Sequence, residues 1–193
     1  MSDQLSLFAP AMSGPELTDL QGLLAGPGQA VRSRDTARLS VIVDEQWRAD
    51  ALLAAFADRG LAGDQVPADS DGTAVRTEFS RSLSPLAHRW LSGAVKSAPA
   101  GFVLDGAGLR LWVIAAGAPA ATVAGYLLRL GPTDEPAWPK SGAALAAAGV
   151  PATFVGVRAG GPGYRITGRR RLTRLREMIG EPPPGADAWP AVP

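Results

Sequence analysis

The chain has 193 residues, with 19 Lys and Arg against 18 Asp and Glu, one His and no Cys. Without cysteine it forms no disulfide, Cys-ligated zinc site or thiol nucleophile, and one His excludes a multi-histidine metal site. The hydrophobic fraction of 46% is typical of a folded domain, and no segment is predicted to span a membrane or to direct export. We therefore expect a cytoplasmic protein with no metal or other cofactor.

The first fifteen residues contain an isolated apolar cluster, Gln4-Leu5-Ser6-Leu7-Phe8, followed by prolines and glycine. These turn-forming residues predict a flexible tail over 1–15. The pentapeptide resembles, at all five positions, the QL(S/D)LF motif by which bacterial polymerases and repair proteins dock on the replicative sliding clamp. Leu5, Leu7 and Phe8 suit an apolar pocket, and Gln4 can both donate and accept hydrogen bonds beside it. The alternative is that LSLF is a hydrophobic anchor that packs on its own domain.

Between the tails, hydrophobic periodicity and turn residues predict an element order that occurs twice. In the first half we expect a helix over 16–24, strands over 31–34 and 38–43, a helix from 44 or 45 to 60, a strand over 75–80 with Val75, Thr77 and Phe79 on one face, and a helix over 84–93. In the second half we expect a helix over 108–116, a strand over 123–130, a helix over 140–148, strands over 153–158 and 164–167, and a helix over 169–179.

Each half therefore reads as helix, hairpin, helix, hairpin, helix. This order predicts an α+β protein of two repeats, 16–104 and 105–180, related by pseudo-twofold symmetry, with each antiparallel sheet covered by helices on one face. A proline-rich tail, 181–193, should be extended or disordered. Trp189 in that tail either packs back onto the body or stays free.

Two segments resemble a known family motif. Residues 20–28, LQGLLAGPG, align without gaps to the nine-residue motif of the LAGLIDADG homing endonucleases and keep both of its glycines. Residues 109–117, LRLWVIAAG, keep the last glycine but have Leu111 where the family has its helix-packing glycine. The chain from about 16 to 180 thus resembles these enzymes and their degenerate relatives among actinobacterial regulators. The alternative is that each segment is an apolar helix ended by glycine.

The resemblance implies that the two motif helices form a central interface and that the two sheets make a saddle that lies in the DNA major groove. It also implies that a nuclease would hold a metal-binding carboxylate at the penultimate position of each motif. Pro27 and Ala116 occupy those positions, and neither side chain can ligate a hard cation. We therefore expect no enzymatic activity. A repair enzyme that uses Asp44, Glu45 or Glu78 is an alternative, although their spacing does not support it.

A DNA-facing surface is predicted from arginines on strands and on the last helix. Arg32 and Arg34 are expected to share one face of the first strand, and 158–176 is the most basic segment, with seven arginines and no acid. These side chains suit phosphates or guanine edges, although the alternative is an ordinary solvated surface. The predicted DNA contacts are Arg32, Arg34, Arg76, Arg129, Arg158, Arg165, Arg170, Arg171 and Arg174.

Together these features predict a monomeric, non-catalytic accessory protein of DNA replication or repair. It would bind the sliding clamp (the polymerase beta subunit) through Gln4 to Phe8 and double-stranded DNA through the saddle, within the nucleoid or replisome. Linking two weak sites raises the effective concentration at each. Two other functions compete with this one: a sequence-specific transcription regulator in which QLSLF is coincidental, and a clamp-binding inhibitor that needs no DNA.

Overall fold

The computed structural model describes residues 14–69, 71–121 and 124–191. Its first half contains η1 (Leu17–Leu20), α1 (Gln21–Ala25), β1 (Gln29–Ser33), β2 (Thr36–Val43), α2 (Gln46–Ala57), β3 (Gly63–Pro67), β4 (Thr73–Thr77), η2 (Arg81–Leu83), α3 (Ser84–Trp90), β5 (Leu91–Ser92) and β6 (Val95–Lys96). Its second half contains α4 (Gly106–Ala116), β7 (Gly117–Pro119), β8 (Gly125–Arg129), η3 (Glu135–Ala137), α5 (Trp138–Ala147), β9 (Thr153–Val155), η4 (Val157–Ala159), β10 (Gly163–Thr167) and α6 (Arg169–Ile179).

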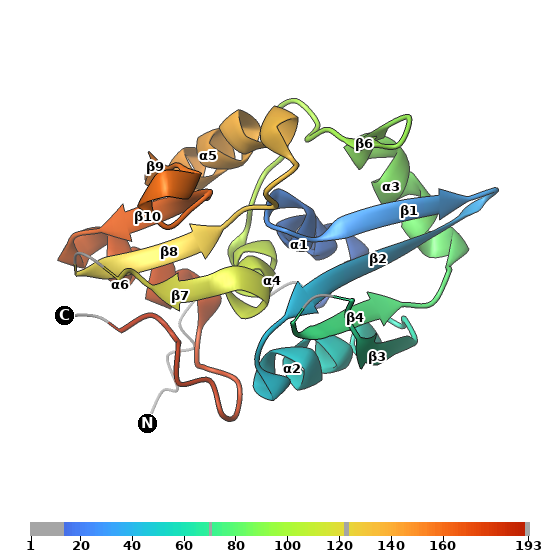
Figure 1. Cartoon of the computed structure of the whole chain (residues 1–193), viewed down its shortest axis with the longest axis horizontal. Helices are drawn as coiled ribbons and strands as arrows, with labels where there is room; N and C mark the ends of the chain where they lie inside the picture. Colours follow the sequence, from blue (N-terminus) through green and yellow to red (C-terminus); the bar gives the residue numbers. More distant parts are fainter. Residues whose placement is uncertain (1–13, 70, 122–123, 192–193) are drawn as a thin grey trace, which may run out of the picture.

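The two halves build equivalent antiparallel sheets. The strand order is β1-β2-β4-β3 in the first sheet and β7-β8-β10-β9 in the second. Figure 1 shows the sheets side by side, with α1 and α4 between them. The predicted α+β class, with two sheet-forming repeats, is confirmed. Among the described helices none is long and apolar enough to cross a membrane.

Each sheet buries one face and leaves the other open. On β2, Leu39, Val41 and Val43 are at most 3% exposed, whereas the residues between them point to the opposite face. Helices α2 and α3 cover the buried face of the first sheet, and α6 packs on β10 of the second. The alternation along β2 thus separates a core face from a face that remains available to a partner.

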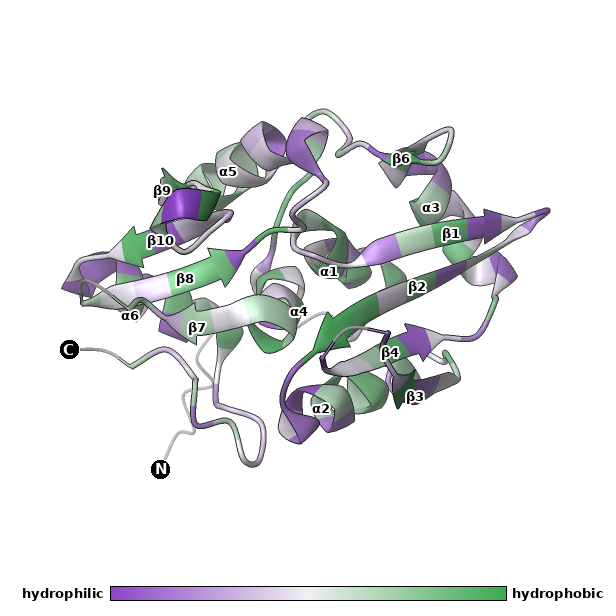
Figure 2. Cartoon of the chain, viewed as in Figure 1, coloured by the Kyte–Doolittle hydropathy of each residue, from purple (hydrophilic) through white to green (hydrophobic). Residues whose placement is uncertain are grey.

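Helices α1 and α4 touch through their backbones at the centre of the molecule. A Cβ atom on Gly22 would overlap the carbonyl oxygen of Gly108, so only glycine permits this approach. On the α4 side the close approach is made at Gly108, whereas Leu111, which stands where the family motif has its glycine, lies three residues further along α4 and is buried. Figure 2 shows that α4 is largely hydrophobic, as a central helix must be.

The C-terminal segment after α6 packs back onto the body. The indole of Trp189 is 9% exposed and donates a hydrogen bond to the Gly180 carbonyl. The Tyr126 hydroxyl donates to the Ala188 carbonyl at 2.9 Å, and burial raises the pKa of Tyr126, so it stays a neutral donor. Of the two alternatives left open for Trp189, the structure shows the first.

Two strand details differ from the sequence expectation. Strand β4 ends at Thr77, so Phe79 does not share the buried face of Val75 and Thr77 and is 43% exposed. Strand β7, which follows α4 directly, was not expected. Its three residues are too few to show an alternating pattern of apolar and polar residues.

Substitution of Gly22 by Ala should destabilise the protein by about 3 kcal/mol, because α1 and α4 must separate to admit the methyl group. Helix propensity acts in the opposite direction, since Ala is favoured over Gly by about 1 kcal/mol in a helix. Urea denaturation measures the change, with Gly14→Ala as the control because the space around Gly14 is open. A Gly22→Ala protein as stable as the wild type would contradict the backbone contact.

Candidate functional site

The open face of the first sheet carries Arg38 and Arg76. Ser40 pairs with Arg76 across β2 and β4, and Arg38 precedes Ser40 by two residues, so all three side chains share this face. Arg76 binds both carboxylate oxygens of Asp64, at 2.7 and 3.0 Å, which holds the pKa of Asp64 below its ordinary value. Arg38 lies over the ring of Phe79, and its buried Nε has no hydrogen-bond partner within the described residues.

The open face of the second sheet also carries two arginines. Arg165 on β10 lies opposite Leu127 on β8, and Arg129 follows two residues later on the same face. The Nε of Arg165, like that of Arg38, is buried without a hydrogen-bond partner in the part of the chain that the structure covers. Ile42 of the first open face and Arg129 of the second line one central hollow, so both open faces look onto the same side of the molecule.

Three predicted arginines lie elsewhere. Arg32 pairs with Ala37, which is fully buried, so Arg32 points to the helix-covered side and donates to the Gly93 carbonyl at 3.3 Å. Arg34 is in the turn between β1 and β2 with a φ of 55°, not on a strand. Arg158 lies in η4 because β9 ends at Val155. Arg32 does lie on the first strand, but the expectations that Arg34 shares its face and that Arg158 lies on a strand were wrong.

The arginines of α6 form a separate basic surface. Leu172, Leu175 and Ile179 bury one side of α6 in the core. The other side exposes Arg170, Arg171 and Arg174, which border a hollow beside Gly149 at the end of α5. The structure does not bring them together with Arg129 and Arg165, which lie on the opposite face of the sheet. Their contact with DNA stays a prediction.

The ends of α1 and α4 converge on the central hollow. Pro27 and Ala116 both line this space of about 440 Å³, together with Asp44, Glu45 and Arg48. The two positions at which the resemblance implies catalytic carboxylates thus meet in one place, although neither side chain has an oxygen. Asp44 is 83% exposed and Glu45 is 41% exposed.

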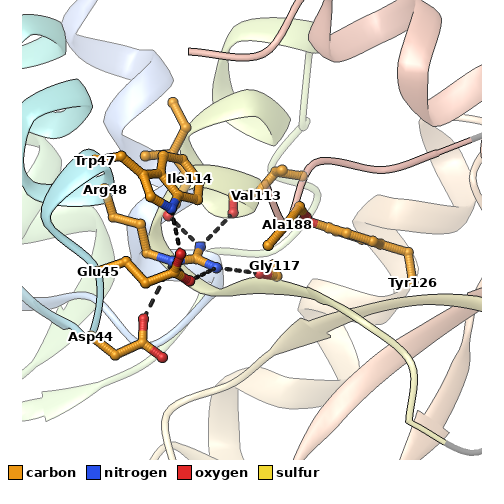
Figure 3. Close-up of polar contacts among 9 residues, drawn as sticks. All are labelled: Asp44, Glu45, Trp47, Arg48, Val113, Ile114, Gly117, Tyr126 and Ala188. Carbon is orange, nitrogen blue, oxygen red and sulfur yellow. Dashed lines mark hydrogen bonds and ion pairs between the residues drawn. The ribbon is translucent and has the colours of Figure 1, made fainter. Parts of the chain in front are cut away.

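Arg48 closes the end of α4 (Figure 3). This residue of α2 is 4% exposed, and its guanidinium donates to the carbonyl oxygens of Ile114 and Gly117, both at 2.7 Å. It also pairs with Asp44 at 3.3 Å and with Glu45 at 3.2 Å. A fixed cation at a helix C-terminus compensates the negative end of the helix dipole. Both nearby carboxylates are therefore engaged by a charge that the chain itself supplies.

Lys96 places a positive charge at the C-terminal end of α1, as Arg48 does at the end of α4. Its ammonium donates to the carbonyls of Gly26 and Gly28 at 2.7 and 2.8 Å and pairs with Asp134 at 2.6 Å. Gln29 donates to the same carboxylate. Burial lowers the pKa of Lys96, because the loss of hydration outweighs the attraction of Asp134. Arg48 of the first half binds carbonyls of α4 in the second half, and Asp134 of the second half pairs with Lys96 in the first. The contacts of Arg48 and of Lys96 therefore also join the two halves.

These surroundings do not fit a catalytic divalent cation. A hard cation needs several oxygen ligands, and the described residues contain no group of three or more His, Cys, Asp or Glu side chains that could hold a metal. At the hollow the carboxylates of Asp44 and Glu45 already pair with Arg48, whose charge would repel a metal ion.

Sequence reasoning missed Arg38, Arg48 and Lys96. The alternation of apolar residues along 37–43 could have placed Arg38 on an exposed face. The spacing of Asp44, Glu45 and Arg48 could have indicated local ion pairs, but no sequence signal shows that Arg48 and Lys96 bind the backbone carbonyls at the helix ends, because those carbonyls are distant along the chain. The pentapeptide Gln4, Leu5, Ser6, Leu7 and Phe8 lies outside the described residues.

No family model matches the chain, and no curated protein matches it in sequence. Among solved structures, it is similar to the homing endonuclease I-WcaI bound to its DNA recognition sequence. The match covers 84% of this chain and 79% of that chain, with a TM-score of 0.59 and 9% sequence identity. The chain has the fold of a homing endonuclease. At this identity the similarity concerns the fold alone. In this chain Arg48 and Lys96 bind the backbone carbonyls at the C-terminal ends of the two central helices.

Asp134→Asn should cost about 3 kcal/mol of stability or more, because it leaves the buried ammonium of Lys96 without a counter-charge. The matched control is Asp35→Asn, whose partner Arg81 is 82% exposed, and we expect it to cost about 0.5 kcal/mol or less. Urea denaturation of both variants gives the two values. Equal, small losses would show that the buried pair contributes no more than a surface pair.

Proposed function

We propose that this protein binds double-stranded DNA through the open faces of its two sheets and does not cleave it. The observation that carries the proposal is that Arg38 and Arg165, one on the open face of each sheet, each have a buried Nε without a hydrogen-bond partner among the described residues. A buried guanidinium nitrogen without a partner is costly, and a phosphate or a guanine edge would satisfy it. The structural neighbour supports DNA as the partner, since that endonuclease is bound to its DNA recognition sequence.

The absence of cleavage follows from what surrounds the ends of the central helices. Pro27 and Ala116 offer no ligand, and Arg48 and Lys96 place positive charge at both helix ends. A nuclease of this fold would need metal-bound carboxylates there. The scaffold would thus keep its DNA surface and lack the groups that hydrolyse the backbone.

The N-terminal pentapeptide adds the second part of the proposal, docking on the bacterial sliding clamp. Its support is the agreement of Gln4 to Phe8 with the clamp-binding motif at all five positions. A clamp encircling DNA would bring the protein to duplex DNA, and the two contacts would then reinforce one another. The protein would serve replication or repair as an accessory factor. A transcription regulator remains the alternative, favoured if a long specific sequence emerges from selection on random DNA.

Arg38→Ala and Arg165→Ala should each weaken duplex binding and reduce the slope of log affinity against log salt by about 1 if the contact is to a phosphate. A contact to a base edge would cost about 1–3 kcal/mol instead and relax sequence preference. Fluorescence anisotropy over a salt titration distinguishes the two. Arg89→Ala is the matched control, because Arg89 is exposed on α3, behind the sheet. Equal effects of all three substitutions would contradict the assignment of the open faces.

Incubation with duplex DNA and Mg²⁺ or Mn²⁺ should give no specific product, since the helix ends lack metal ligands. Gel analysis of plasmid and oligonucleotide substrates checks this expectation. Specific cleavage that disappears on substitution of Asp44 or Glu45 would instead assign the protein to the nucleases.

Leu7→Ala combined with Phe8→Ala should abolish binding to the clamp, because both side chains that fill the apolar pocket are removed. The affinity for DNA should stay unchanged, since the proposed DNA contacts, Arg38 and Arg165, lie on the open faces of the sheets. Surface plasmon resonance with immobilised clamp gives the result. Undiminished clamp affinity in the double variant would disprove the docking role of the pentapeptide.

A further inference from the structure

An apolar groove runs between α2 and α4, on the surface formed by these helices and the C-terminal segment. Its volume is about 670 Å³, within the range of sites that enclose a small organic ligand. The buried side chains of Leu111 and Ile114 contribute from α4, and three alanines line it from α2: Ala51, Ala54 and Ala55. Small side chains on one wall leave room for larger apolar ones from elsewhere. We call this space the α2–α4 groove.

The C-terminal segment forms part of the lining without filling the groove. Pro182 to Pro184 line it, and Arg110 holds that segment in place. The Arg110 guanidinium donates to the carbonyls of Ile179 and Glu181 at 2.6 and 2.5 Å and lies over the ring of Trp189. The segment is thus fixed by its own contacts, and the space beside it remains open.

The chain enters the fold beside this groove. Pro15 is one of the lining residues, and the following residues are anchored by Arg59 of the segment after α2. Arg59 donates to the Glu16 carbonyl at 2.9 Å and pairs with Asp19 at 2.6 Å, where both side chains are less than a tenth exposed. The preceding residues, 1–13, therefore start from a fixed point next to the groove.

We propose that the α2–α4 groove receives the apolar side chains of Leu5, Leu7 and Phe8. Six residues lie between Phe8 and Pro15, and the seven residue steps that join these two positions extend at most about 25 Å. Helix α2, with 12 residues, is about 18 Å long, so the pentapeptide reaches any point along it. The match is between a groove whose α2 wall carries, beyond Trp47, three small alanines and a nearby segment of the same chain that supplies three large apolar side chains.

Docking in the groove and docking on the clamp use the same side chains, so each excludes the other. The competition between the groove and the clamp rests on the proposed clamp docking, whereas the occupancy of the groove by the pentapeptide does not. The apparent affinity for the clamp is the intrinsic affinity multiplied by the fraction of molecules with the pentapeptide free. If one molecule in ten has it free, clamp binding is on the order of tenfold weaker than the peptide alone would give.

The first test measures occupancy in the full chain without the clamp. Alanine methyl resonances of Ala51, Ala54 and Ala55 are compared between the wild type and the Leu7→Ala/Phe8→Ala variant. We expect shifts at these methyls and none in Asp3→Asn, a polar change in the same segment outside the pentapeptide. Superimposable spectra for the wild type and the double variant would overturn the proposal, whether or not the clamp binds.

The second test measures competition by filling the groove. Ala54→Phe places a ring over the groove from an exposed position of α2, and Ala57→Phe is the control, exposed on the same helix outside the lining. Ala54→Phe should bind the clamp on the order of tenfold more tightly than the wild type, and Ala57→Phe should match the wild type. Equal clamp affinity in all three proteins would refute the exclusion. Failure of all three to bind the clamp, together with shifted alanine methyls, would refute clamp docking and keep the groove contact.

Discussion

The backbone contact between Gly22 and Gly108 is the constraint on which the rest of the molecule depends. Because α1 and α4 meet without intervening side chains, their C-terminal ends converge on one hollow and the two sheets lie side by side. Converging helix ends concentrate partial negative charge from unsatisfied carbonyls. The fold therefore requires positive charge at this place. In this chain the side chains of Arg48 and Lys96 supply that positive charge. Because each of them also has a partner in the other half, Ile114 for Arg48 and Asp134 for Lys96, these contacts hold the two repeats together.

This arrangement separates two properties that a nuclease of the same fold would combine. The proposed DNA surface depends on strand register, which brings Arg38, Arg129 and Arg165 to open faces on one side. Hydrolysis by a nuclease of this fold depends on metal-binding carboxylates at the helix ends. In this chain the buried side chains of Arg48 and Lys96 lie there instead. A chain without metal ligands at the helix ends could still keep the proposed DNA surface, because the strands and the helix ends make different contacts. We therefore propose for these residues the binding of DNA without its cleavage.

Much of the fold could be predicted from the sequence, because the signals are local. The predicted bounds of the last helix, 169–179, coincide with those of α6, since the apolar spacing and the glycines on either side define it. Short strands such as β7 carry too little pattern to be recognised. Of the candidate DNA contacts, Arg129 and Arg165 were placed on the correct strands, whereas Arg34 failed because a turn of two residues cannot be distinguished from a strand end. The carbonyl contacts of Arg48 and Lys96 could not be found, because a cation that binds backbone carbonyls far along the chain leaves no periodicity or spacing.

The central claim is that one protein uses two linked contacts, one to DNA and one to the clamp. The most direct test is its affinity for duplex DNA carrying a loaded, topologically trapped clamp, compared with the same duplex without a clamp, at a fixed salt concentration. We expect binding to clamp-loaded DNA to be at least about a hundredfold tighter, because the second contact becomes intramolecular. Equal affinity for the two substrates would contradict the account.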